Sequence, residues 1–219
     1  NDTIDGGLGT DIAIFSGNKS NYTIEEVAYA QYLVTDNQGT DGVDSLKNIE
    51  TLQFSDQNFD ITPSGQNLTG TNSEDNLTGL TGDDLIIGLG GNDTLDGGDG
   101  NDEIQGGDGD DTIYGGEGAD TIYGGDGDDN IRGGKSSYDS DLRDDLDVIY
   151  GGDGDDTIYG FGKTTIYGDG GDDTISAVDY NANTSDLVVY GGDGDDNINA
   201  RSFKSVDAGD GDDIVQMSQ

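Results

Sequence analysis

Cysteine, histidine and tryptophan are absent from the 219-residue chain, and it contains a single proline. Without cysteine or histidine the chain lacks the ligands that zinc and copper prefer, which argues against a site for either metal. It also lacks the cysteine–histidine and serine–histidine pairs on which nucleophilic catalysis depends. No disulfide can form, so the composition leaves the redox compartment open.

Positively charged side chains are scarce as well. Only 8 lysines and arginines stand against 48 aspartates and glutamates, which gives a net charge of −40 at pH 7. So acidic a surface repels nucleic acids and anionic membranes, and no apolar run approaches the ~18–20 residues that span a bilayer. We expect no nucleic-acid partner and no membrane insertion, and no signal peptide opens the sequence. High net charge with few apolar residues is typical of disordered chains. The carboxylates must therefore be neutralised before this chain can collapse.

Glycine, by contrast, is abundant, with 40 residues, and it is periodic. From Gly79 to Arg132 the chain consists of six uninterrupted units of nine residues whose consensus is GGxGxDxUx, in which U is aliphatic. Position 6 is occupied by Asp84, Asp93, Asp102, Asp111, Asp120 and Asp129, and position 8 by Ile86, Leu95, Ile104, Ile113, Ile122 and Ile131. Units elsewhere in the chain place Asp11, Asp156, Asp173, Asp196 and Asp213 at position 6.

Each unit predicts one turn and one short strand. Glycines at positions 1, 2 and 4 permit a tight turn with positive φ and bring backbone carbonyls close to a ligand. Positions 7 to 9 form a strand in which residue 8 faces away from residues 7 and 9. One inward aliphatic side chain per unit is too thin a core to stand alone, so the units must stack, two to a coil of eighteen residues. The stack predicts two parallel sheets with turns along both edges.

The turns predict metal sites, because each edge becomes a ladder of aspartates and glycine carbonyls. A hard cation with six to eight oxygen ligands suits such a ladder, and Ca²⁺ fits better than the smaller Mg²⁺. The candidate ligands are the eleven position-6 aspartates named above and the carbonyls of Gly97, Gly106, Gly115, Gly124, Gly151 and Gly191. A flexible acidic linker would explain one such run, but not eleven turns that mostly share one register.

Four segments depart from the repeat, and we expect them to be interrupting loops: 133–150, 160–167, 177–190 and 200–207. The first places Tyr138 and Ser140 where its first unit should have Asp and an aliphatic residue, whereas Asp147 keeps position 6 of its second unit. The departures contain Lys135, Arg143, Lys163, Arg201 and Lys204. One hypothesis is that these cations replace Ca²⁺ and offset nearby carboxylates; the alternative is drifted repeats with solvated charges. The roll should then alternate between loaded and empty turns. The unit at Gly70 lacks the middle glycine and is expected to bind weakly or to cap the roll.

Tyrosine recurs at position 9, on the outward face of the strands, at Tyr114, Tyr123, Tyr150, Tyr159, Tyr167 and Tyr190. Such strips could stack on sugars or contact a partner protein. The simpler interpretation is that tyrosine suits a half-exposed strand. The many paired carboxylates do not indicate a glycosidase, because no apolar pocket singles out one pair.

The repeat pattern resembles the RTX (repeats-in-toxin, hemolysin-type calcium-binding) family over about two thirds of the chain. The resemblance implies an all-β fold, a right-handed parallel β-roll at 65–219 that binds several Ca²⁺ ions. It implies an extracellular module of a type I secreted bacterial protein, unfolded in the low-calcium cytosol and folded outside. Its role would be secretion, stability and support of a larger polypeptide, without catalysis of its own. The alternatives are an adhesin or carbohydrate-binding module with a glycan or protein ligand, or an accessory module of a secreted epimerase, protease or lipase.

The N-terminal part departs most from the repeat. Residues 1–14 are a partial repeat unit, and 15–64 are expected to form a β-rich insertion or hairpin extension. Alternating patterns predict strands within 22–25, 29–35 and 49–54, and turn residues fill 37–44. The string from Asp41 to Asp56 resembles a segment found beside repeats in large RTX proteins. An EF-hand loop at 36–50 is excluded, because its glycine and acidic positions do not match.

Overall fold

The chain folds into two compact units, Asn1–Ser64 and Gly65–Gln219. The computed structural model describes residues 1–7, 11–28, 31–38, 42–49, 51–61, 65–134, 146–179 and 186–218. In these ranges every regular element is a β-strand except one short 3-10 helix, η1 (Lys19–Asn21).

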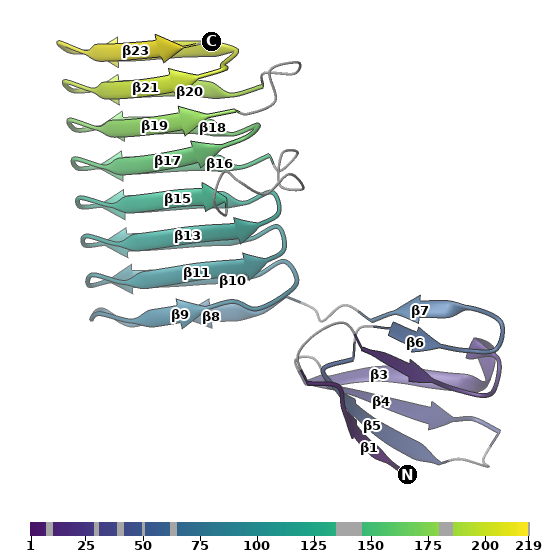
Figure 1. Cartoon of the computed structure of the whole chain (residues 1–219). Helices are drawn as coiled ribbons and strands as arrows, with labels where there is room; N and C mark the ends of the chain where they lie inside the picture. Colours follow the sequence, from purple (N-terminus) through teal and green to yellow (C-terminus); the bar gives the residue numbers. More distant parts are fainter. Residues whose placement is uncertain are drawn as a thin grey trace. The chain divides into compact units, whose positions relative to one another are not determined.

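The larger unit is a parallel β-roll of two stacked eight-stranded sheets (Figure 1). The even sheet contains β8 (Asn67–Thr69), β10 (Leu85–Gly90), β12 (Glu103–Asp108), β14 (Thr121–Asp126), β16 (Val148–Asp153), β18 (Thr165–Gly170), β20 (Val188–Asp193) and β22 (Ser205–Asp210). The odd sheet contains β9 (Asn76–Thr78), β11 (Thr94–Asp99), β13 (Thr112–Glu117), β15 (Asn130–Gly134), β17 (Thr157–Phe161), β19 (Thr174–Val178), β21 (Asn197–Arg201) and β23 (Ile214–Ser218). Neighbouring strands pair in parallel, which confirms the predicted all-β parallel β-roll.

The core of the roll is made by the aliphatic residues at position 8. Ile86 pairs with Ile104, and Ile104 with Ile122, so that equivalent residues lie one above the other in successive coils. From Ile86 to Ile198 these side chains are fully buried, whereas Leu68 and Val215, near the two ends of the stack, are partly exposed. The core is therefore one side chain thick in each sheet, and each coil depends on its neighbours for burial.

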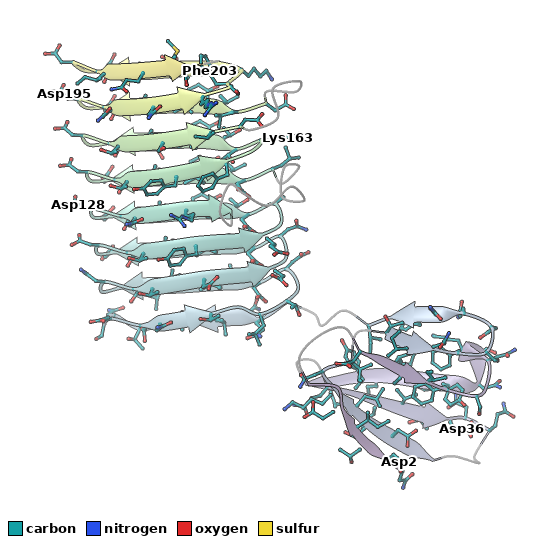
Figure 2. The ribbon with its side chains drawn as sticks, viewed as in Figure 1. Asp2, Asp36, Asp128, Lys163, Asp195 and Phe203 are labelled. Atoms are coloured by element: carbon teal, nitrogen blue, oxygen red, sulfur yellow. The ribbon has the colours of Figure 1, made fainter. Side chains whose placement is uncertain are left out.

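The turns lie along two opposite edges of the roll (Figure 2). We call the turns that lead from an even strand to the next odd strand the continuous edge; their position-6 residues are Asp75, Asp93, Asp111, Asp129, Asp156, Asp173, Asp196 and Asp213. The turns that lead from an odd strand to the next even strand form the interrupted edge; their position-6 residues are Asp84, Asp102, Asp120, Asp147, Thr164, Leu187 and Lys204.

All four departures from the repeat fall on the interrupted edge. Beyond Asp147, turns with an aspartate at position 6 therefore alternate along the chain with turns that lack one. Segments 160–167 and 200–207 are not loops. Each ends one strand, turns within three residues and begins the next strand, between β17 and β18 and between β21 and β22. The preceding strand, β17 or β21, has five residues instead of the six of β10 to β14, and the strands on both sides keep their partners. The ends of 133–150 and 177–190 also belong to strands, and their inner parts, with Tyr138 and Ser140, lie outside the described residues.

Gly106, at position 1 of a turn, has no room for a side chain. A Cβ placed on it would lie 2.3 Å from Oδ2 of Asp111 and 2.4 Å from the carbonyl oxygen of Gly124. At Gly134 the nearest atoms would be 3.8 Å away. We expect Gly106→Ala to destabilise the folded roll by about 1–3 kcal/mol through overpacking, and Gly134→Ala to change stability by less than about 1 kcal/mol. Urea denaturation of both variants checks this, and equal losses would contradict the packing argument.

The N-terminal unit contains two small sheets. Its strands are β1 (Thr3–Asp5), β2 (Ile12–Ile14), β3 (Tyr22–Ala28), β4 (Gln31–Asp36), β5 (Val43–Lys47), β6 (Thr51–Gln53) and β7 (Asn58–Asp60), in the orders β1-β5-β4-β3 and β2-β6-β7. Strand β1 pairs in parallel with β5, and β2 with β6. The partial repeat and segment 43–53 therefore stack like two coils. The antiparallel pair of β3 and β4 lies between them in the sequence and extends the sheet beyond β5. Residues 1–14 and 15–64, expected as separate parts, share both sheets.

Three of these strands overlap segments predicted from the sequence, and two were missed. The patterns at 22–25, 29–35 and 49–54 correspond to β3, β4 and β6, apart from residues 29, 30 and 50, which lie outside the described ranges. Strand β5 was missed, because Val43 and Asp44 begin a strand rather than ending a turn. Strand β7 was also missed.

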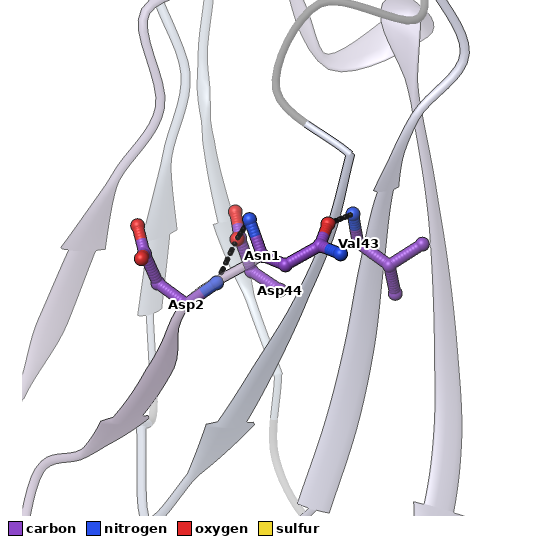
Figure 3. A network of polar contacts seen from close by, with 4 residues as sticks. All are labelled: Asn1, Asp2, Val43 and Asp44. Carbon is purple, nitrogen blue, oxygen red and sulfur yellow. Dashed lines mark hydrogen bonds and ion pairs between the residues drawn. The ribbon is translucent and has the colours of Figure 1, made fainter.

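Hydrogen bonds join the start of β1 to β5 (Figure 3). Oδ1 of Asn1 accepts the backbone N–H of Val43 at 2.8 Å, and Oδ1 of Asp44 accepts the backbone N–H of Asp2 at 2.8 Å. Behind this contact Leu46 of β5 is fully buried in the core of the unit. The partial repeat is thus held by β5, the strand that the sequence analysis did not predict.

Candidate metal-binding turns

One oxygen of each position-6 carboxylate is built into the stack. Oδ1 accepts the backbone N–H of the position-6 residue in the preceding coil, at 2.7 Å from Asp93 to Asp111 and 2.8 Å from Asp111 to Asp129. The same hydrogen bond continues along the continuous edge to Asp213, and on the interrupted edge it joins Asp84, Asp102, Asp120 and Asp147. Because this bond fixes the rotation of the carboxyl group, the second oxygen has a defined direction.

The second oxygen, Oδ2, is buried, and in the part of the chain that the structure describes it accepts no hydrogen bond at seven of these residues. They are Asp93, Asp102, Asp111, Asp129, Asp156, Asp173 and Asp196, and each side chain is at most 2 % exposed. Burying an ionised carboxylate oxygen without a partner in a protein interior costs roughly several kcal/mol of folding free energy. The turns therefore require a proton or a cation at Oδ2.

Backbone carbonyls converge on the same place. A point 2.3 Å from Oδ2 of Asp111 lies 2.4 Å from the carbonyl oxygen of Gly124, and this point is the empty Cβ position of Gly106. The six glycines whose carbonyls were predicted as ligands all share this relation with an aspartate: Gly97 with Asp84, Gly106 with Asp93, Gly115 with Asp102, Gly124 with Asp111, Gly151 with Asp129 and Gly191 with Asp173. The structure thus brings each predicted carbonyl close to a predicted carboxylate.

This set of donors suits Ca²⁺. Within the described residues, no group of three or more acidic, histidine or cysteine side chains that could hold a metal occurs. A cation in these turns would therefore take one carboxylate from a turn and complete its shell with backbone carbonyls. Calcium accepts such mixed oxygen shells of flexible geometry, whereas Mg²⁺ demands a near-ideal octahedron and gives up its water reluctantly.

Burial raises the pKa of these carboxyl groups far above the usual value of 3.8. The pKa is raised to about 6 at Asp102 and Asp111, to about 7 at Asp129 and Asp173, and to about 8 at Asp156. Desolvation is the main cause in each case; the hydrogen bond from the preceding aspartate N–H opposes it, and neighbouring carboxylates add to it. Without metal, these turns therefore bind protons near neutral pH, and a cation must displace them.

The four remaining predicted ligands are two that resemble the others, Asp11 and Asp120, and two that differ, Asp84 and Asp213. Asp11, in the N-terminal unit, repeats the arrangement of the roll: the Cβ position of Gly6 lies 2.8 Å from its Oδ2 and 2.1 Å from the carbonyl oxygen of Asn48. Asp84 accepts hydrogen bonds on both oxygens, from the backbone N–H groups of Gln66 and Leu80. Asp120 is buried like its neighbours, and Asp213, in the last coil, is partly exposed.

Two other position-6 residues were not among the predicted ligands. Asp147 is buried, and its Oδ2 lies 2.7 Å from the Cβ position of Gly133. The sequence signal was present, since Asp147 occupies position 6. At Asp75, Oδ2 accepts hydrogen bonds from the backbone N–H and the hydroxyl of Thr71. This agrees with the expectation that the first turn of the roll binds weakly or caps it.

The tyrosines of the even sheet stack on one another. Ring centroids are 5.0 Å apart between Tyr123 and Tyr150, 4.8 Å between Tyr150 and Tyr167, and 4.9 Å between Tyr167 and Tyr190, with nearly parallel planes. The ring faces of Tyr150 and Tyr167 are covered by their neighbours. This favours the interpretation that tyrosine stabilises the strands over a platform on which sugars stack.

The repeat is recognised by a family model, that of the RTX calcium-binding nonapeptide repeat. It matches residues 1–13, 69–104, 105–136, 144–160, 162–177 and 188–203, more than half of the chain. The chain belongs to this family. RTX nonapeptide repeats bind calcium ions, and the repeat is a structural module rather than a catalytic one. RTX repeat proteins are typically secreted.

Other comparisons add little to the RTX assignment. No curated protein matches the chain. Among solved structures it is similar to the extracellular lipase LipA from Serratia marcescens, with 21% identity, a TM-score of 0.25, and coverage of 67% of this chain and 26% of the lipase. This RTX chain thus spans about a quarter of that lipase. Within the described ranges, no helix has the length and apolar character needed to cross a membrane.

Proposed function

We propose that this RTX chain is a calcium-driven folding module whose position-6 aspartates hold the ions. The observation that carries the proposal is the buried, unpartnered Oδ2 of seven aspartates, each beside a backbone carbonyl. The residues we assign are the eleven predicted aspartates together with Asp147, and the carbonyls of Gly97, Gly106, Gly115, Gly124, Gly151 and Gly191. Asp84 and Asp213 are the weakest of these, because their oxygens are already bonded or exposed.

Ion binding and folding are coupled in this proposal. A net charge of −40 repels the chain open, and the core has only one aliphatic side chain per strand to oppose that repulsion. Each ion adds two positive charges at a place where a carboxylate is buried. A ligand that binds only the folded state stabilises it by mass action. The chain would thus stay unfolded where calcium is scarce and fold where it is millimolar.

This behaviour suits a secreted or cell-surface protein of which the chain is one module. We assign the module no catalytic role, because each turn contributes a single buried carboxylate and the chain has neither histidine nor cysteine. Its contribution to the larger protein would be export in an unfolded state, followed by folding and structural support outside the cell. Any enzymatic or adhesive activity of the larger protein would depend on segments other than these turns.

A far-UV circular dichroism titration tests the proposal. We expect the spectrum of an unfolded chain in EDTA and a cooperative change to a β spectrum as Ca²⁺ is added, because the buried carboxylates then gain their cation. Mg²⁺ at the same concentrations is the control and should produce little change. A β spectrum that persists in EDTA at neutral pH would contradict the coupling of folding to calcium.

A further inference from the structure

The two edges of the roll place different chemistry at the same position of the turn. On the continuous edge an aspartate occupies position 6 in every turn from Asp75 to Asp213. On the interrupted edge the aspartates end at Asp147, and Thr164, Leu187 and Lys204 follow. Figure 2 shows the two edges, with Asp128 and Asp195 on the continuous one and Lys163 and Phe203 on the interrupted one. The change divides the roll into an N-terminal zone, 79–158, and a C-terminal zone, 159–218.

Carbon atoms replace the carboxylate oxygen at the first altered turn. The Cβ position of Gly115 lies 2.5 Å from Oδ2 of Asp120, and that of Gly133 lies 2.7 Å from Oδ2 of Asp147. At Gly160 the three nearest atoms are instead Cδ1 of Ile166, Cγ2 of Thr164 and Cγ1 of Ile166, at 2.7, 3.1 and 3.4 Å. The hydroxyl of Thr164 donates to the carbonyl oxygen of Phe161 at 2.6 Å. The turn is thus closed by its own groups and offers no carboxylate to an ion.

Apolar side chains continue this replacement in the next two turns. Leu187 is fully buried at position 6, and its carbonyl oxygen accepts the backbone N–H of Lys204 at 2.8 Å. Position 1, where a Cβ would lie within 3 Å of an aspartate oxygen at the glycines from Gly79 to Gly124, is occupied here by Ala177 and Ala200, both fully buried in the core. Phe203 packs against the same core. Aliphatic groups therefore occupy positions 1 and 6 of the turn before β20, where the buried carboxylate is that of Asp179 at position 3.

No lysine occupies position 6 in the first two altered turns, which argues there against the hypothesis that cations replace Ca²⁺; Lys135 and Arg143 lie outside the described residues. The position-6 residues of the first two altered turns are the buried Thr164 and Leu187, and Lys204 in the third is exposed. The positive charges of Arg201 and Lys204 remain at the surface, where they reduce the net negative charge of this edge. Each coil of the C-terminal zone thus has one position-6 carboxylate, which is buried at Asp173 and Asp196 and partly exposed at Asp213, whereas each coil of the N-terminal zone buries two. Asp179, at position 3, is a further buried carboxylate of the C-terminal zone.

We propose that the two zones differ in their demand for calcium: the N-terminal zone binds ions along both edges, and the C-terminal zone along the continuous edge only. This inference rests on the proposed function, since it concerns the same kind of site. As calcium is withdrawn, each coil of the N-terminal zone is left with two position-6 carboxylates that have lost their cation, and each coil of the C-terminal zone with one. The N-terminal zone therefore loses its structure first, and partial calcium depletion produces a chain that is folded only toward its C-terminal end.

Hydrogen exchange of the full chain at graded free calcium, read by mass spectrometry, tests the order. We expect the amides of β11 to β14 to lose protection at a free calcium concentration about tenfold higher than those of β18 to β21. Simultaneous loss in both zones, or earlier loss in β18 to β21, would overturn the inference while leaving calcium-driven folding intact. Protection that is independent of calcium everywhere would instead overturn the proposed function.

A pair of variants tests the sites themselves. Native mass spectrometry should show that Asp102→Asn lowers the number of bound Ca²⁺ ions by at least one, because it removes a carboxylate from the N-terminal zone of the interrupted edge. Thr164→Val keeps the methyl group that fills the equivalent place and removes only the hydroxyl, so the ion count should stay unchanged. A lower ion count in Thr164→Val would show that an ion binds at this turn and would refute the zoned arrangement.

Discussion

Replacing Asp129 with asparagine is expected to destabilise the calcium-loaded roll by about 3–5 kcal/mol, the usual cost of removing one partner from a buried charge pair. Asparagine keeps an Oδ1 that can accept the N–H of Asp111, now bonded at 2.8 Å. It removes the negative charge at Oδ2, which is buried and, in the described part of the chain, unpartnered. The calcium concentration at the midpoint of folding should rise about tenfold or more. Calcium titrations followed by circular dichroism, with urea denaturation at saturating calcium, measure both effects.

Asp128→Asn is the matched control, because it removes the same charge one residue away. Asp128 is exposed, and its Oδ1 accepts the backbone N–H of Asp155 at 2.9 Å, a bond that asparagine can keep. We expect stability to change by less than about 0.5 kcal/mol and the calcium midpoint to move little, since exposed charges are screened. If Asp128→Asn and Asp129→Asn raised the midpoint equally, overall charge rather than the buried oxygen would control folding.

The repeat alone was sufficient to predict the fold and the kind of site in the roll. Position 8 predicted the core from Ile86 to Ile198, and position 6 predicted most of the carboxylates that the turns bury, the exception being Asp179 at position 3. Both follow from local rules: a strand alternates its faces, and a glycine-rich turn leaves room for one inward carboxylate. Because these rules repeat every nine residues from Gly79 to Arg132, the position of each residue in one unit predicts its place in every other unit of this stretch.

The asymmetry of the two edges was not predicted, although the sequence contains the signal for it. Each nine-residue unit crosses the roll once, so alternate units lie at opposite edges. Segment 133–150 is twice nine residues long, and 160–167 is one residue short of a unit, so neither changes this alternation. Counting units in this way places Thr164, Leu187 and Lys204 on one edge. The stacking of Tyr150 on Tyr167 follows from the same count, because both lie on the even sheet.

The N-terminal unit was harder to predict because its pairings are not local. Strand β5 pairs in parallel with β1, about forty residues earlier in the chain, and Ile4 faces Leu46. The alternation in Val43–Lys47 is short and follows directly on turn residues, so the sequence pattern favoured a turn. This segment forms a strand because it pairs with β1 and because Leu46 becomes buried.

Acidification should stabilise the calcium-free roll and weaken calcium binding. In the folded state the pKa is about 6 for Asp111, about 7 for Asp129 and about 8 for Asp156, against 3.8 for an unperturbed carboxyl group. A raised pKa means that the folded state binds more protons than the unfolded state between about pH 4 and pH 8. The contribution of these groups to stability is therefore fully present below about pH 4 and is lost as the pH rises through 6 to 8. In EDTA we expect β structure to increase as the pH falls from 8 toward 5.

Calcium reverses this dependence, because the ion competes with the same protons. Isothermal titration calorimetry in buffers of different ionisation enthalpy should detect proton release on calcium binding at pH 6–7 and almost none at pH 9. Asp156→Asn should reduce the release at pH 7, since the pKa of Asp156, about 8, is higher than those of Asp102, Asp111, Asp129 and Asp173, whereas Asp155→Asn, one residue away, should not. Binding without proton release at pH 6–7 would show that the ions do not bind at the buried carboxylates. Proton release at this pH would show that protons and Ca²⁺ compete for the same buried carboxylate oxygens, for which the described residues provide no hydrogen-bond donor.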